Sequence, residues 1–179
     1  ATTYEDQPIT YDNGAPVNNA SGSFNGTTTI RTAIRNSVNT VAVQCFEDVT
    51  PELGLKYLDN FGFTTLAHGT EADTDANGNV YTDANLPTAL GGLTYGLERE
   101  LCAAYAAIAN GGNYIKPVYY TKILDHNGNV LIENNSVGRS VIKETTAYLL
   151  TSALEDVVQN GTGTACQLDN MAVAGKTGT

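Results

Sequence analysis

Apolar residues in the first part of the chain recur at steps of three and four residues, which is the spacing of one buried helix face. Between Thr27 and Cys45 this pattern predicts one amphipathic helix or two short abutting helices. Pro51 predicts the start of a further helix, because its fixed φ suits the first helical position, and Gly62 predicts its end. Residues 28–66 are therefore expected to form a helical region.

The second half of the chain combines helical and alternating patterns. Helices are predicted over residues 97–110, with Leu101 and Tyr105 on the buried face, and over residues 143–158. Between them lie two strands joined through Asn127-Gly128, a dipeptide that favours a tight hairpin turn. This order of elements predicts a mixed α+β fold, with a helical region and part of an antiparallel sheet, rather than a doubly wound sheet.

Two segments show little periodicity. Residues 1–27 are rich in Gly, Asn, Ser, Thr and Pro, and we interpret them as an approach segment without a core of its own. Residues 67–89 are interpreted as a loop insertion. Residues 90–179 follow it with a helix, a hairpin, a helix and a terminal strand, and the whole chain is interpreted as one domain or most of one.

The loop insertion begins like a calcium-binding loop, with Asp73, Asp75, Asn77 and Gly78. The match then fails, because Ala84 occupies the twelfth position, where a bidentate glutamate is required. The alternative is a turn between short strands, built by asparagine and glycine. We favour the turn and expect no metal and no cofactor.

Charge and composition narrow the range of partners. The 179 residues include nine basic and nineteen acidic side chains, a formal net charge of −10, which makes nucleic acid an unsuitable partner. No apolar run approaches the roughly 20 residues of a membrane helix, and the N-terminus has no signal-peptide pattern. The three cysteines are too few and too scattered for a disulfide scaffold, and Cys45 and Cys102 are expected to be buried free thiols.

The strongest chemical signal is the final run of small residues from Ala172 to Thr179, which we predict to be a strand carrying Lys176 and Thr177. Gly-Lys-Thr resembles the end of a phosphate-binding loop, but Asn170 stands where that loop needs a glycine. Taken alone, Lys176 also fits a solvated charge on an edge strand. The signal gains weight only when a second motif joins it.

That second motif is Ser37-Val38-Asn39, at the centre of the first helical pattern. Taken alone, Ser37 fits an exposed helix position and Asn39 a helix cap. Ser-x-Asn followed by Lys-Thr-Gly is, however, the order of two of the three motifs of penicillin-binding proteins and serine β-lactamases. Flanking stretches agree over most of residues 8–179: IRTAIRNSVNTVAVQ, TALGGLTYGL, AAYAAIANGG and GTGTACQLDNMAVAGKTGT. The chain thus resembles the transpeptidase domain of a class A, bifunctional penicillin-binding protein.

The third motif of that family, Ser-x-x-Lys with the nucleophilic serine, has one literal match, Ser140-Val-Ile-Lys143. We reject it because the family's Ser-x-x-Lys precedes Ser-x-Asn, whereas this match follows it. We therefore expect the nucleophile to lie before Ala1, the chain to be an excerpt of a larger protein, and the excerpt to be inactive alone.

The resemblance implies roles for the matching residues. Ser37 would relay a proton to the leaving amine, positioned by Lys176, and Asn39 would donate a hydrogen bond to the substrate amide or to the lysine of Ser-x-x-Lys. Thr177 would bind the terminal carboxylate of the substrate. Gly178 would leave room for a peptide beside the strand, and the N–H of Thr179 would form half of an oxyanion hole.

The function implied is DD-transpeptidation, the cross-linking of peptidoglycan by serine acyl transfer, with stem peptides and β-lactams as the partners of the intact protein. Its place would be the outer face of a bacterial cell membrane, held by an anchor outside this chain. Two alternatives remain, a non-catalytic binding or assembly subdomain and a β-lactamase-like hydrolase. Because we also expect further sheet strands after Thr179, an unpaired edge should favour self-association.

Overall fold

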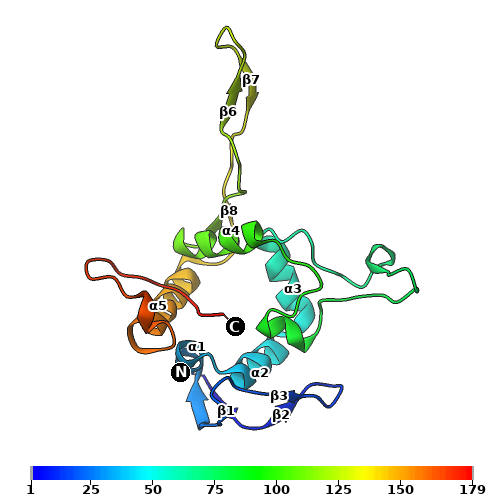
Figure 1. The fold of residues 1–179 in the computed structure, drawn as a ribbon, viewed down its shortest axis with the longest axis vertical. Helices are drawn as coiled ribbons and strands as arrows, with labels where there is room; N and C mark the ends of the chain where they lie inside the picture. The colour runs from blue at the N-terminus through cyan, green and yellow to red at the C-terminus, as the bar shows by residue number, and fades with distance from the viewer. Residues whose placement is uncertain (1, 179) are drawn as a thin grey trace.

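The computed structural model describes residues 2–178, and its helices surround the C-terminal segment in the view of Figure 1. The α-helices of these residues are α1 (Ile30–Asn36), α2 (Asn39–Val49), α3 (Pro51–Asn60), α4 (Glu98–Ala109) and α5 (Glu144–Asn160). Short 3₁₀ helices are η1 (Glu71–Asp73), η2 (Leu86–Leu90) and η3 (Thr164–Cys166). None of the described helices is long and apolar enough to cross a membrane.

The strands of the described residues form four separate antiparallel pairs. They are β1 (Thr3–Asp6) with β4 (Gly26–Thr29), β2 (Ile9–Thr10) with β3 (Pro16–Val17), β5 (Asn113–Tyr114) with β8 (Arg139–Ser140), and β6 (Lys122–Leu124) with β7 (Val130–Glu133). Helices and antiparallel strands are mixed along the chain, which confirms the predicted α+β class.

The first helical pattern resolves into two helices, α1 and α2, with a sharp break at Ser37. Ser37 caps α1 in the left-handed conformation, with φ of 56°, and Val38 N donates to Ala33 O at 2.9 Å. Thr29 caps the other end of α1 by accepting a hydrogen bond from Thr32 N at 3.1 Å. The break therefore ends one helix and starts the next within two residues.

Among residues 2–178, buried side chains between the helices form three clusters. They are Leu55, Phe63, Leu66 and Ala104; Ala33, Val38 and Val41; and Ala103, Ala107 and Tyr114. Contact between α1 and α5 is reinforced by Arg31, whose guanidinium donates to the carbonyl and the hydroxyl of Ser152, each at 3.0 Å. This contact brings the Ser37 end of α1 beside the segment that follows α5.

Three local expectations were wrong. Residues 1–27 contain paired strands, and Val17 and Asp6 are buried, so this segment contributes to the core instead of only leading up to it. On α4 Glu100, Ala103, Ala104 and Ala107 are buried, whereas Leu101 and Tyr105 are exposed. Cys102 is exposed as well, because it lies next to Leu101 on the outer side of the helix.

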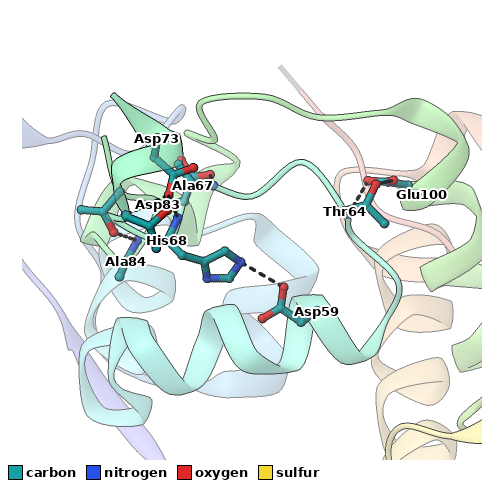
Figure 2. Close-up of polar contacts among 10 residues, drawn as sticks. Asp59, Thr64, Ala67, His68, Asp73, Asp83, Ala84 and Glu100 are labelled. Atoms are coloured by element: carbon teal, nitrogen blue, oxygen red, sulfur yellow. Dashed lines mark hydrogen bonds and ion pairs between the residues drawn. The ribbon is translucent and has the colours of Figure 1, made fainter. Parts of the chain in front are cut away.

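The loop insertion is organised around a buried aspartate. Asp83 is 1% exposed and accepts hydrogen bonds from Ala67 N at 2.8 Å and from Thr94 N and Oγ1 at 2.7 Å each. Figure 2 shows this region beside α3, where His68 Nε2 lies 3.3 Å from Asp59 Oδ1. In place of the short strands that we expected, the described part of the loop has two isolated bridges, His68 with Thr82 and Thr74 with Val80.

The residues of the calcium-like stretch bond to the loop itself. Asp73 Oδ2 accepts from Thr70 N, Thr70 Oγ1 and His68 N at 2.9, 2.8 and 3.0 Å. Asp75 Oδ1 accepts from Asn77 N and Asn79 N, both at 2.8 Å. The two carboxylates thus stabilise turns, and residues 2–178 contain no group of three or more His, Cys, Asp or Glu that could hold a metal ion.

The hairpin of β6 and β7 projects away from the helices (Figure 1). Its turn, Asp125 to Asn129, repeats the geometry of the Asp75 turn. In both turns the aspartate Oδ1 accepts two backbone N–H groups at 2.8 Å, and the second asparagine bonds the same carboxylate through Nδ2. Gly128 has φ of +87°, as the predicted Asn-Gly turn requires. The hairpin is confirmed, with one register shift between Ile123 and Leu124.

Candidate active site

The two motifs singled out in the sequence meet in the structure. Lys176 Nζ donates a hydrogen bond of 2.7 Å to Ser37 Oγ, across 139 residues of chain. The same ammonium also donates to its neighbour's carbonyl, Thr177 O, at 3.2 Å. A hydrogen bond with a charged donor is among the stronger kinds in proteins, so it holds the serine oxygen and the lysine in one geometry.

The environment of Lys176 changes its acid–base behaviour. Although the residue as a whole is exposed, partial removal of its ammonium from water lowers its pKa from the ordinary value. A lysine with a lowered pKa exchanges its proton more readily near neutral pH than an ordinary surface lysine. The pair can therefore stabilise negative charge on Ser37 Oγ or take part in moving its proton.

The segment that carries Lys176 is not a paired strand in the described residues, so the predicted strand from Ala172 onward is wrong as far as Gly178. A strand is defined by hydrogen bonds to a neighbour, and residues 172–178 have none of the ladder type within 2–178. The segment is fixed instead by Gly175 N, which donates to Leu154 O of α5 at 3.2 Å.

Thr177 lies beside a second hydroxyl that the sequence had not identified. Thr177 Oγ1 and Thr162 Oγ1 are 2.8 Å apart and share a hydrogen bond. Thr162 is held against α1, because its N–H donates to Arg35 O at 3.2 Å. Gly161 allows that approach, since a Cβ on this residue would collide with the backbone carbonyl of Arg35. Nothing in the local sequence identified Thr162 as the partner of Thr177, because fifteen positions separate them.

Asn39 is the first residue of α2, not its cap, which is Val38. Its Nδ2 donates to Asn18 O at 2.8 Å and fixes the side chain against the approach segment. The second N–H of the amide and its Oδ1 remain able to bond a ligand. Asn39 and Ser37 belong to one turn, whereas Lys176 reaches that turn from the far end of the chain.

Gly178 borders open space, because a Cβ built on it meets no atom within 4 Å. A ligand could therefore come close to the backbone at this point. Thr179, expected to supply an oxyanion-hole N–H, lies outside the described residues.

The rejected Ser140–Lys143 match has separate structural roles. Ser140 belongs to β8 and its hydroxyl donates to Ile142 O at 3.3 Å, while Lys143 is the N-cap residue of α5. No hydrogen bond joins the two side chains in the described structure. Ser37 and Lys176, in contrast, are joined by a direct hydrogen bond between their side chains.

Comparisons with known proteins agree with this picture. The family model described as the penicillin binding protein transpeptidase domain matches residues 1–179. Penicillin-binding protein 1A of Clostridium novyi (strain NT) is 35% identical over 164 residues, which is 89% of this chain and 18% of that protein. Its counterpart in Streptococcus pneumoniae (strain ATCC BAA-255 / R6) is 34% identical over 182 residues, covering 100% of this chain and 24% of that protein. The chain thus spans about a fifth of the length of these relatives.

Solved structures share the fold. Penicillin-binding protein 1A of Haemophilus influenzae superposes with a TM-score of 0.78 at 22% identity, covering 99% of this chain and 31% of that one. The D,D-transpeptidase domain of a peptidoglycan glycosyltransferase from Eggerthella lenta gives a TM-score of 0.74 at 23% identity, with 99% and 48% covered. With the family model spanning the whole sequence, the chain belongs to the penicillin-binding protein transpeptidase domain family.

Proposed function

We propose that this chain supplies the Ser-x-Asn and Lys-Thr-Gly parts of a serine acyl-transfer site that cross-links peptidoglycan. The observation that carries the proposal is the 2.7 Å hydrogen bond from Lys176 to Ser37. The nucleophile would be the serine of a Ser-x-x-Lys segment upstream of Ala1, since the family's motif order puts it there. The chain alone would then be unable to form an acyl-enzyme.

In this proposal the nucleophilic serine attacks the carbonyl carbon of the penultimate D-alanine, and the C–N bond to the last D-alanine breaks. The leaving nitrogen needs a proton, and Ser37 relays it: its hydroxyl gives one proton to the nitrogen and in turn takes up the proton that the attacking serine loses. Lys176 stabilises the negative charge that grows on Ser37 Oγ as that proton leaves. An amine from a neighbouring strand then attacks the ester and releases the serine. A β-lactam would undergo only the first half of this reaction: the nucleophilic serine attacks the carbonyl carbon of the lactam ring, and the C–N bond of the ring breaks.

The polar groups around this pair suit the rest of such a substrate. Thr177 and Thr162 share one hydrogen bond at 2.8 Å, so one hydroxyl proton of the pair is left to donate to the terminal carboxylate. Asn39, with one N–H and its Oδ1 free of the Asn18 contact, could bond the peptide amide. The open space beside Gly178 would admit the peptide backbone. The oxyanion hole would be completed by the N–H of Thr179 and that of the nucleophile.

The parent of this domain would act at the outer face of the cell membrane, held by an anchor outside this chain. Stem peptides and β-lactams would be its ligands. The proposal needs no cofactor, because both bond changes are acyl transfers between nucleophiles.

A fluorescent penicillin tests the proposal. We expect covalent labelling of an extended protein, in which this chain follows its upstream Ser-x-x-Lys segment, and no labelling of residues 1–179 alone. Ser140→Ala and Lys143→Ala in the extended protein are the controls, and both should be labelled at the wild-type rate. Labelling of the isolated chain on any serine would refute the placement of the nucleophile. Continuous hydrolysis of a chromogenic β-lactam, instead of one turnover per molecule, would favour the hydrolase alternative.

A further inference from the structure

A buried carboxylate lies behind the Ser37–Asn39 turn. Asp6, the last residue of β1, is 1% exposed, and its two oxygens accept four hydrogen bonds. Oδ1 accepts from Thr40 Oγ1 at 2.6 Å and from Asn19 Nδ2 at 2.7 Å, and Oδ2 accepts from Asn25 N at 2.9 Å and Asn25 Nδ2 at 3.1 Å. Burial by itself would raise the pKa of Asp6, but the hydrogen bonds from Thr40, Asn19 and Asn25 outweigh it and lower the pKa.

Asn19 connects this carboxylate to the start of α2. Val38, the N-cap of α2, makes no side-chain cap hydrogen bond. Asn19 Oδ1 instead accepts a hydrogen bond from Thr40 N at 3.3 Å, from a position 21 residues earlier in the chain. It thereby satisfies one of the N–H groups that a helix start leaves unpaired. Asn19 Nδ2 donates hydrogen bonds to Asp6 Oδ1 and to Ser23 O. These two bonds orient the amide so that its oxygen, Oδ1, faces Thr40 N.

The turn that these contacts hold is one that needs support. Ser37 has φ of 56°, a left-handed conformation that costs a non-glycine residue free energy and persists when its surroundings fix it. Thr40, 0% exposed, comes directly after Asn39 and bonds to both Asp6 and Asn19. Asn39 is tied to Asn18, the neighbour of Asn19, at 2.8 Å. The supports of Ser37 and Asn39 therefore converge on one buried group.

We propose that Asp6 is a positioning residue for acyl transfer: through Thr40 and Asn19 it fixes the first turn of α2, and so holds Ser37 at hydrogen-bond distance from Lys176. This inference rests on the function proposed above. It goes beyond that function because Asp6 touches neither the substrate nor the reacting atoms.

Asp6→Asn in the extended protein tests the inference. The amide that replaces the carboxylate brings two donors into a site that already holds four, so at least one hydrogen bond must be lost. We expect acylation by a fluorescent penicillin to slow by about 10- to 100-fold, the range that misplacing a reacting group by about 1 Å produces. Asp83→Asn is the matched control, because Asp83 is equally buried and accepts three hydrogen bonds, none of them from residues 37–40. It should lower the melting temperature comparably and leave the acylation rate unchanged.

Substitutions of Thr40 give an answer even if Asp6→Asn does not fold. Thr40→Ser keeps the hydroxyl that bonds Asp6 and should be acylated at the wild-type rate. Thr40→Val lacks this hydroxyl, and its acylation should slow by about the same factor as that of Asp6→Asn. Equal slowing by Asp83→Asn, or wild-type rates in both Asp6→Asn and Thr40→Val, would overturn the positioning role. Absence of labelling in the wild-type extended protein would overturn the proposed function together with this inference. A labelled wild type with unaffected variants would overturn the inference alone.

Discussion

The hydrogen bond between Lys176 and Ser37 leads to the most direct prediction. Lys176→Gln removes the charge and keeps a donor of shorter reach, so the contact with Ser37 Oγ at 2.7 Å is lost or weakened. Hydrogen bonds to charged groups contribute about 1.5–3 kcal/mol, and 1.36 kcal/mol corresponds to a tenfold change in rate, so acylation should slow about 10- to 150-fold. Because the lysine is exposed, the melting temperature should change little.

The assay is the rate of labelling by a fluorescent penicillin in the extended protein, measured over a range of concentrations. Lys143→Gln, which removes a lysine outside the site, is the matched control and should keep the wild-type rate. Since the pKa of Lys176 is lowered, the wild-type rate should also change with pH at a lower value than an ordinary lysine would give, and this step should be absent from Lys176→Gln. A Lys176→Gln protein that is acylated at the wild-type rate would remove Lys176 from the mechanism.

Three further predictions follow from other parts of the structure. The pKa of Asp75 is lowered to about 2, first by the side chain of Asn79 and then by its backbone N–H, so an NMR titration should show a midpoint near that value. Because the folded pKa is below the unfolded one, the stabilisation is present above the ordinary value of 3.8 and is lost as the pH falls towards 2; a midpoint near 4 would contradict the turn geometry. Gly161→Ala should destabilise the protein by about 1–3 kcal/mol, because its Cβ meets the backbone of Arg35, whereas Gly96→Ala, with open space around it, should have little effect in the same thermal denaturation. The exposed apolar hairpin of β6 and β7 should promote self-association, and light scattering that shows only monomers at high concentration would disprove this.

Local signals were sufficient for much of the secondary structure. Pro51 starts α3 as predicted, and the helix predicted over residues 143–158 is α5, Glu144–Asn160, with Ala147, Leu154 and Val157 buried. These elements depend on hydrogen bonds and side-chain neighbours within a few residues, so a short window of sequence contains their signals. The family resemblance also identified the residues of the Ser-x-Asn and Lys-Thr-Gly motifs, whose catalytic roles remain predictions.

Contacts between distant segments could not be derived in this way. The paired residues of β1 and β4 are at least twenty positions apart, and these short, polar strands have no periodic pattern that would reveal the pairing. Leu101 and Tyr105 have the spacing of a buried face, yet α4 buries Ala103 and Ala107 instead, because the neighbouring elements pack closely against it. Hydrophobicity predicts that a helix has a buried side, but the shape of its neighbours decides which side that is.

The sequence by itself determined the α+β class, most helix limits, the hairpin turn and the two family motifs, because each depends on residues close together in the chain. Only the tertiary structure decided that Lys176 reaches Ser37, that Thr162 lies beside Thr177, and that Asp6 supports the turn from behind. Each of these contacts joins segments that are far apart in sequence and that meet only when the helices pack and the strands pair. The sequence identified Ser37 and Lys176, and the packing of α1 against α5 brings the two residues together.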